Sequence, residues 1–482
     1  MLYRLFHFVA GFALRWFYRD TQVVGLERVP AAGPLIVAAN HPNALIDVLV
    51  IGRTLPRRLT LTGKATLFAN PVLRWLLTSV GFVPLQRAKD LTAAGQPANP
   101  ARNREAFRAV LDALADGRAV LIFPEGISHD APSIAPLKTG AARMALQARD
   151  ERGLRAVRVL PVGLSYERKW ATRSRVVLEI GEPVDMDAWV APAGESAADA
   201  LTAEIDARLR AVTLNFATAE ERERVLGLSR MLTPLFDEPR PLSESGAPLP
   251  ELVSIARRVA DAQARHDRHE SPATRARVEA FERRLASYRE LLDVYRLSPA
   301  DVCIDLGARP AAWFVVRELV VAAVAGPLAL WGRVNHWLAF RLTRAVGARL
   351  SRTPEDPAMI TVVVGAALVL AFYALQTTLV WKLAGPWWAL AYLVTLPPSA
   401  NWDLHYSDRL RRARARTRTY LTLRRDPALH ARLVGEVQWL RGEVVEIERE
   451  LAGVPAKQGL GPSASPHDAT NAGDGRQATA AN

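Results

Sequence analysis

At 482 residues the chain is too long for one ordinary hydrophobic core, so two or three structural regions are expected. Half of the residues are hydrophobic and 23% are charged, a mixture that indicates a soluble part joined to an apolar part. The net charge of +13 predicts affinity for something anionic, while the single cysteine excludes an internal disulfide framework and a cysteine-rich metal site.

The N-terminal segment 1–20 is apolar but is interrupted by Arg4, His7 and Arg15. A secretory signal needs an unbroken apolar core and a cleavage site of small residues, and this segment has neither. An interfacial helix fits the pattern, and so does a terminal helix docked on the protein's own core. Both alternatives predict that the N-terminus is not exported.

Residues 21–215 have the pattern of an α/β domain. Apolar runs of strand length alternate with stretches of helical period, such as 102–116 and 136–149. The runs expected to form strands are 34–39, 80–85, 119–123, 158–165 and 175–180. This alternation predicts a mixed, largely parallel sheet flanked by helices, and an amphipathic helix near 197–213 closes the domain.

Residues 216–300 are charged and alanine-rich, and they are expected to form a mostly helical region with helices near 251–265 and 272–295. The pattern does not predict what this region does.

A membrane-embedded region is expected over residues 301–400. Residues 358–381 carry no charge and are long enough to cross a hydrocarbon core of about 30 Å. A shorter apolar stretch ending near residue 398 is expected to pair with this span as a hairpin. Residues 311–340 are apolar but are broken by charges and by a Gly-Pro pair, which favours a re-entrant or interfacial hairpin over a clean span.

Arginines flank this region on both sides, and a dense run lies between Arg409 and Arg418. Because basic loops stay cytoplasmic, we expect an even number of crossings in the cytoplasmic membrane of a bacterium, with the α/β domain facing the cytoplasm. The arginines are expected to contact anionic membrane phospholipid. Residues 401–454 are predicted to be a basic, amphipathic helical region, and the tail 455–482 is predicted to be disordered.

The segment ANHPNALID (39–47) directly follows the first strand-length run. Proline disfavours helical backbone in the residue before it and suits the first turn of a helix, so His41 should lie on a strand-to-helix loop and Asp47 about one turn inside the helix. On a continuous helix the two would lie about 120° apart, so the loop must fold the imidazole back toward the carboxylate. An Asp that holds one ring nitrogen leaves the other free to accept a proton from a hydroxyl. The alternative is a capping histidine beside an unrelated acid.

Two further blocks supply cations. Lys64 lies in GKATLF (63–68) and Arg87 ends VGFVPLQR (80–87), at positions where strands are expected to end. The ends of strands are the usual location for ligand contacts in open α/β sheets.

Two more blocks follow along the chain. FPEGIS (123–128) puts Glu125 and Gly126 in a tight turn after a buried strand, where a carboxylate and backbone amides are free to bind a polar ligand. VLPVG (159–163) is a strand interrupted by Pro161, as at an edge or a bend.

Together these blocks, in this order and spacing, resemble those of the glycerolipid acyltransferase family, which includes lysophosphatidic-acid and glycerol-3-phosphate acyltransferases. The resemblance covers roughly residues 20–215. The common family pattern has four residues between its His and its Asp, whereas this chain has five. The form HPNALID, with a long C-terminal extension, is similar to the branch that acylates glycerol-3-phosphate or dihydroxyacetone phosphate.

The resemblance implies that His41 is the general base that deprotonates an acceptor hydroxyl as it attacks the thioester of acyl-CoA or acyl carrier protein. It implies that Asp47 orients His41 and stabilises the imidazolium. The other residues expected to bind substrate are Asn43, Lys64, Arg87, Glu125, Gly126 and Pro161.

Within that set, Lys64 and Arg87 are expected at the acceptor phosphate, with Arg87 as the principal cation because it can bind phosphate bidentately. Glu125 and Gly126 are expected to shape the acceptor site, where Glu125 contacts a glycerol hydroxyl or orders the cations. Pro161 is expected to line the acyl or thioester side.

No metal and no bound cofactor are expected, because the sequence has no clustered His and Cys ligands. One alternative function is a lysophosphatidate acyltransferase that makes phosphatidate, and another is a non-catalytic lipid-binding membrane scaffold. Nucleic-acid binding is not expected, because it has only the net charge in its favour. Acyl-chain length and oligomeric state are not determined by the sequence.

Overall fold

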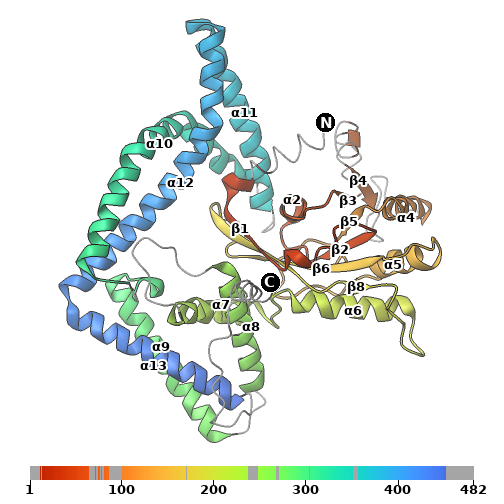
Figure 1. Cartoon of the computed structure of the whole chain (residues 1–482), viewed down its shortest axis with the longest axis horizontal. Coiled ribbons are helices and arrows are strands. Elements are labelled where there is room, and N and C mark those ends of the chain that lie inside the picture. Colours follow the sequence, from red (N-terminus) through yellow and green to blue (C-terminus); the bar gives the residue numbers. More distant parts are fainter. Residues whose placement is uncertain are drawn as a thin grey trace, which may run out of the picture.

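The computed structural model describes residues 14–64, 81–85, 100–169, 171–236, 248–266, 271–302, 304–350 and 356–451, together with residues 11, 71, 74, 75 and 78. Figure 1 shows an α/β domain beside a frame of long helices. Cys303, Arg87, most of the N-terminal segment 1–20 and the tail 455–482 lie outside the described residues.

A single eight-stranded sheet forms the centre of the α/β domain. Its strands are β1 (Tyr18–Val24), β2 (Leu35–Ala39), β3 (Leu59–Lys64), β4 (Phe82–Leu85), β5 (Ala119–Ile122), β6 (Arg158–Tyr166), β7 (Ser174–Ile180) and β8 (Val184–Asp185). The order is β1-β7-β6-β2-β5-β3-β4, and β8 pairs with β6. All neighbouring strands are parallel except β6 with β7 and with β8. The predicted mixed, largely parallel sheet is confirmed.

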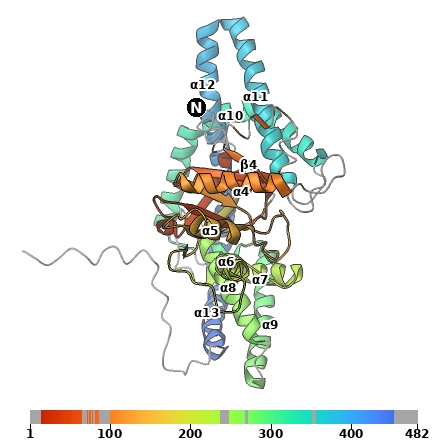
Figure 2. The same ribbon diagram turned by 90° about the vertical axis from the view of Figure 1, so that its right-hand side faces the viewer.

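Helices cover both faces of this sheet. Alternate residues of β2 point to opposite faces, so Leu35 and Val37 pack in one core and Ile36 and Ala38 in another. Helix α2 (Ala44–Thr54) covers the first face. Helices α4 (Pro100–Ala115), α5 (Gly140–Asp150) and α6 (Ala197–Ala211) cover the second and stand toward the viewer in Figure 2.

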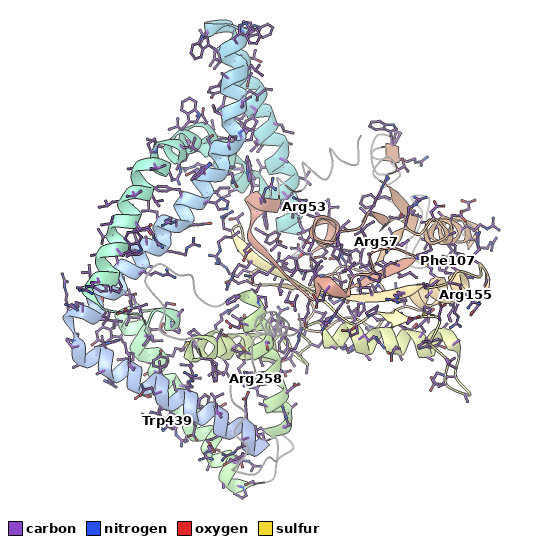
Figure 3. The ribbon with its side chains drawn as sticks, in the orientation of Figure 1. Arg53, Arg57, Phe107, Arg155, Arg258 and Trp439 are labelled. Carbon is purple, nitrogen blue, oxygen red and sulfur yellow. The ribbon has the colours of Figure 1, made fainter. Side chains whose placement is uncertain are left out.

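Arg57, which is labelled in Figure 3, lies at the edge of the sheet where β2 and β5 begin. Its guanidinium donates to the carbonyls of Gly33 at 2.8 Å and Gly117 at 2.7 Å, just before β2 and β5 begin. The carboxyl ends of β2 and β5 therefore lie at the opposite edge of the sheet, away from Arg57.

A second core joins distant segments of the chain. Helices α7 (Ala219–Leu232), α8 (Leu249–His266) and α9 (Pro272–Tyr295) share it with α13 (Pro427–Leu451). Arg258 of α8, labelled in Figure 3, pairs with Glu448 of α13 at 2.5 Å. Helices α7, α8 and α9 thus pack with α13, and Val253 of α8 shares a further apolar cluster with Val177 of β7.

Three long helices form the rest of the frame: α10 (Ala308–Leu350), α11 (Asp356–Ala384) and α12 (Pro386–Arg425). The expectation of a re-entrant hairpin within 311–340 is wrong, because α10 runs through Pro327 without a break. An internal proline removes one backbone donor, a loss that a packed helix can tolerate. The neighbouring helix α12 packs closely on α10, since a Cβ at Gly332 would stand 2.1 Å from the Ser399 carbonyl oxygen.

Helices α11 and α12 form the expected hairpin, which projects from the frame in both views (Figures 1 and 2). Among the described residues, two stretches are long and apolar enough to cross a membrane: Ala308–Gly347 and Thr361–Ala384. The apolar start of α12, expected to be the second crossing, is not one of them. In the apolar part of each stretch only 17% and 11%, respectively, is buried within the protein, whereas a core helix of a soluble protein is mostly buried. The two helices therefore suggest association with a membrane.

Candidate active site

The site lies at the edge where parallel strands end. Strands β2, β3, β4 and β5 all run in the same direction, so the residues that follow them meet at one edge of the sheet. His41 follows β2, Glu125 follows β5, and Lys64 is the last residue of β3. The side chain of Lys64 is not among those described, and Arg87 lies two residues beyond the end of β4 in the sequence, outside the described residues.

His41 and Asp47 are brought together as the loop geometry requires. His41 lies between β2 and α2, and Asp47 lies in the first turn of α2. The distance from His41 Nδ1 to Asp47 Oδ2 is 2.9 Å, and the Asp47 side chain is fully buried. A carboxylate can only accept, so Nδ1 carries the proton and Nε2 presents a lone pair. No hydrogen bond to Nε2 is found within the described part of the chain.

Two other donors reach the Asp47 carboxylate. The Asn43 backbone N–H donates to Oδ2 at 2.6 Å, and the Tyr166 hydroxyl donates to Oδ1 at 2.5 Å. Burial, followed by the Asp47 charge, raises the pKa of the Tyr166 phenol well above its usual range. The phenol therefore stays protonated and acts as a donor. The positive end of α2 also favours a negative charge in its first turn.

The Phe123–Ser128 block holds the His41 loop from the side. The imidazole of His41 stacks on the Phe123 ring, with centroids 3.8 Å apart and planes 12° from parallel. The His41 backbone N–H donates to Glu125 Oε1 at 2.8 Å, and Ser128 Oγ accepts from the Ala44 N–H at 3.0 Å. This block therefore fixes the position of the imidazole relative to the sheet.

Glu125 faces inward in this structure. The residue is 2% exposed, and Oε2 accepts from His129 Nε2 at 2.5 Å and from the Ala135 N–H at 2.7 Å. With the His41 N–H on Oε1, the carboxylate has three donors from the protein itself. An inward carboxylate with these partners braces the His41 loop. That Glu125 contacts a glycerol hydroxyl or orders the cations stays a prediction.

Gly126 and Asn43 both shape local backbone. Gly126 has φ +72°, a conformation that favours glycine, and a Cβ there would stand 2.6 Å from Lys138 Nζ, the end of a flexible side chain. Asn43 is the N-cap residue of α2 and is 1% exposed. Its Nδ2 donates to the Tyr18 hydroxyl at 3.0 Å and to the Lys169 carbonyl at 3.2 Å. Its side chain thus points into the domain.

Pro161 lies inside β6, opposite Ala38 of β2. Its neighbours Leu160 and Val162 pack in the core on the α2 face, so its ring faces the other side of the sheet, beside Gly181. No described contact links Pro161 to His41 or Asp47. Gly163, in the same block, allows close approach to the chain after α6, because a Cβ would stand 1.9 Å from the Val212 carbonyl oxygen.

Sequence reasoning missed Tyr166 and His129. Tyr166 ends β6 and lies 119 positions from Asp47, so no local pattern connects them. His129 follows the FPEGIS block directly, and its i, i+4 spacing from Glu125 was the available signal. Among the described residues no three His, Cys, Asp or Glu side chains group as metal ligands.

Comparison with known families covers this part of the chain. Residues 20–165 match the family model described as Acyltransferase, and this stretch contains His41, Asp47, Glu125 and Pro161. Residues 20–165 therefore form an acyltransferase domain. The His41–Asp47 pair (the dyad), the inward-facing Glu125 carboxylate and the sheet edge where β2 and β5 end all belong to this acyltransferase domain.

Relatives of the acyltransferase domain include proteins named for two acceptors. Glycerol-3-phosphate O-acyltransferase 2 of Saccharomyces cerevisiae is 48% identical over 85 residues, 18% of this chain and 11% of that protein. An uncharacterized acyltransferase of Schizosaccharomyces pombe is 25% identical over 257 residues, 37% of this chain and 38% of its own. A chloroplastic 1-acyl-sn-glycerol-3-phosphate acyltransferase of Brassica napus is 25% identical over 182 residues, which are 36% of this chain and 47% of that protein. The matches span less than half the length of each relative.

Proposed function

We propose that this protein transfers an acyl group from acyl-CoA or acyl carrier protein to a hydroxyl of glycerol-3-phosphate or dihydroxyacetone phosphate, in glycerophospholipid biosynthesis. The 2.9 Å contact between His41 Nδ1 and Asp47 Oδ2 carries this proposal, because it leaves Nε2 as a base. The family match and the relatives named for glycerol-3-phosphate support the same class of reaction.

The proposed reaction is a direct transfer. His41 Nε2 accepts the proton of the acceptor hydroxyl while that oxygen attacks the thioester carbonyl carbon. The carbon–sulfur bond then breaks, and the departing thiolate takes the proton back from the imidazolium. Asp47 holds the ring and stabilises its transient charge. General base catalysis supplies about 10²- to 10⁴-fold, and positioning of the two substrates must supply the rest.

We place Lys64 and Arg87 at the acceptor phosphate. Support comes from strand direction, because β3 and β4 pair in parallel and Lys64 lies opposite Leu85, two residues before Arg87. Lys64 therefore ends β3 at the edge that carries His41, and we propose the same edge for Arg87, which lies outside the described residues. Arg can bind a phosphate with two parallel hydrogen bonds, whereas Lys acts as a point charge.

Lysophosphatidate is the second candidate acceptor, favoured by relatives named 1-acyl-sn-glycerol-3-phosphate acyltransferase. The non-catalytic scaffold remains the alternative without chemistry. The test is acyl transfer by purified, detergent-solubilised protein, supplied with each donor and each of the three acceptors in turn. The preferred acceptor is the one with the highest kcat/KM, expected to be glycerol-3-phosphate or dihydroxyacetone phosphate. No product with folded protein and both donors would favour the scaffold.

We propose that Glu125 supports His41 and does not bind the acceptor. In Glu125→Gln an amide nitrogen must face at least one of the three N–H donors that the carboxylate now accepts. We expect kcat to fall about 10- to 100-fold while the KM for the acceptor stays within about threefold. Steady-state kinetics with varied acceptor measure both constants.

The matched control is Glu182→Gln, which changes a side chain that is 69% exposed and paired with Arg28. It should leave both constants unchanged. A large rise in acceptor KM for Glu125→Gln, at unchanged kcat, would return Glu125 to the acceptor-binding residues.

We propose that the protein is held in a bacterial cytoplasmic membrane, in contact with phospholipid, and that its α/β domain faces the cytoplasm. The two apolar helices and the flanking arginines support this orientation. Protease added to inside-out vesicles should cleave the α/β domain, and right-side-out vesicles should protect it. The reverse pattern would overturn the orientation.

A further inference from the structure

The Asp47 carboxylate is buried, and no lysine or arginine side chain among the described residues is bonded to it. Its partners are His41 Nδ1 and the Asn43 N–H on Oδ2, and the Tyr166 hydroxyl on Oδ1. A carboxylate removed from water needs hydrogen-bond donors to stay ionised. Two of the three donors come from the same loop and helix as Asp47. Only Tyr166 reaches it from another element, the end of β6.

Tyr166 is also held in place by the strand that carries it. Asn40, at the end of β2, exchanges two hydrogen bonds with Leu164 of β6, at 3.1 Å from Nδ2 to the carbonyl and 2.7 Å from the N–H to Oδ1. These bonds fix the end of β6 against the residue that precedes His41. The Tyr166 hydroxyl therefore comes from a part of the sheet that is rigidly connected to the His41 loop.

A second tyrosine lies beside the first without touching the carboxylate. The rings of Tyr18 and Tyr166 are 5.6 Å apart. The Tyr18 hydroxyl donates to the Lys169 carbonyl at 3.4 Å and accepts from Asn43 Nδ2 at 3.0 Å. Tyr18 therefore offers a buried phenol in the same environment, whose removal takes no donor from Asp47.

We propose that Tyr166 is a positioning residue for acyl transfer. Its hydroxyl fixes Asp47 Oδ1 so that Oδ2 stays aligned with His41 Nδ1. The same hydrogen bond moderates the attraction of the carboxylate for the imidazole proton. The proposal rests on the proposed function of the dyad. Without this donor the carboxylate is a stronger base and stabilises the imidazolium more, so His41 holds its second proton to higher pH. A general base that stays protonated is inactive at neutral pH.

The titratable groups that face Asp47 within the described residues are few. They are His41 from the β2–α2 loop, Tyr166 from β6 and, one contact further away, Tyr18 from β1. Glu125 acts on the His41 backbone and not on Asp47. The effect of Tyr166 on the titration of His41 can therefore be isolated by substitution.

The test measures the titration of His41 directly, by NMR of protein labelled with ¹³C-histidine in detergent micelles. The chain has nine histidines, and the His41 signal is assigned by its loss in His41→Ala. In Tyr166→Phe the titration midpoint of His41 should move to higher pH, by roughly half a unit or more. Acyl-transfer kinetics on the same variant should give kcat about threefold or more lower at neutral pH, with acceptor KM within about twofold.

Tyr18→Phe is the matched control, and it should leave the midpoint of His41 at its wild-type position. Fluorotyrosine placed at position 166 is the complementary variant, because its more acidic phenol is a stronger donor of the same shape. It should move the midpoint to lower pH, and this opposite sign tests the proposal even if Tyr166→Phe does not fold.

An unmoved midpoint in both Tyr166 variants, or an equal movement in Tyr18→Phe, would overturn the proposal. If the His41 midpoint moves as predicted in the Tyr166 variants but the wild-type protein transfers no acyl group, the proposed function is overturned. The link between Tyr166 and His41 then still stands. The two failures are therefore distinguishable.

Discussion

Replacing His41 by alanine should lower kcat for acyl transfer by about a thousandfold or more, because the group that we propose as the acceptor of the hydroxyl proton is lost. The loop should keep its shape, since the bonds that hold it are made by the backbone of His41. The N–H donates to Glu125, and the carbonyl accepts from the His129 N–H at 3.2 Å. Initial rates at saturating acceptor measure the loss, and a thermal unfolding curve checks the fold.

The matched control for this prediction is His405→Ala, which removes an exposed histidine on α12. Among the described residues, that side chain bonds only to the carbonyl of Asn401, one turn earlier in the helix. Its rate should equal that of the wild type. If His41→Ala kept more than about a tenth of the wild-type rate, a different group would have to be the base.

Asp47→Asn should lower kcat by about 10²- to 10⁴-fold while the protein remains folded. The amide has nearly the shape of the carboxylate, but its nitrogen must face either Tyr166 or the two donors on Oδ2. In the second orientation His41 is driven to the tautomer that carries its proton on Nε2 and cannot act as a base. In both orientations the negative charge that stabilises the imidazolium is lost.

This prediction is checked with the same kinetic assay and with the exposed carboxylate Asp116, whose side chain is 59% exposed beside Arg118. Asp116→Asn should leave kcat unchanged. A rate for Asp47→Asn close to that of wild type would show that neither the orientation nor the charge of Asp47 matters, and the dyad would then be a capping arrangement.

The local sequence was sufficient for the main elements of the α/β domain. The run 175–180 lies within β7, the run 34–39 covers β2, and the predicted helix 197–213 contains α6. These elements bury apolar side chains in the core of the domain, so the apolar residues recur in their sequences with a clear period. The polar edge strand β1 was not predicted, because Tyr-Arg-Asp-Thr-Gln carries no apolar period, and it begins before the expected start of the domain at residue 21.

The sequence also determined which residues form the pair at the strand end. Proline disfavours helical backbone at His41. The helix begins at Ala44, two residues after the expected start at Pro42, and the imidazole and the Asp47 carboxylate meet over only six positions. Contacts of this kind depend on local backbone alone. The continuity of α10 through Pro327 did not follow from the sequence, because it depends on the packing of α12 against it.

The environment of the pair was decided only by the tertiary structure. Glu125 lies 84 positions from His41 and Tyr166 lies 119 positions from Asp47, and each is brought there by a strand of the sheet. The sequence shows that a carboxylate and a phenol exist, but their direction depends on how β5 and β6 flank β2. Residue identity and local spacing therefore determined the reactive groups, whereas the parallel pairing of distant strands determined which polar atoms hold them, because only the folded sheet places those atoms within hydrogen-bond distance.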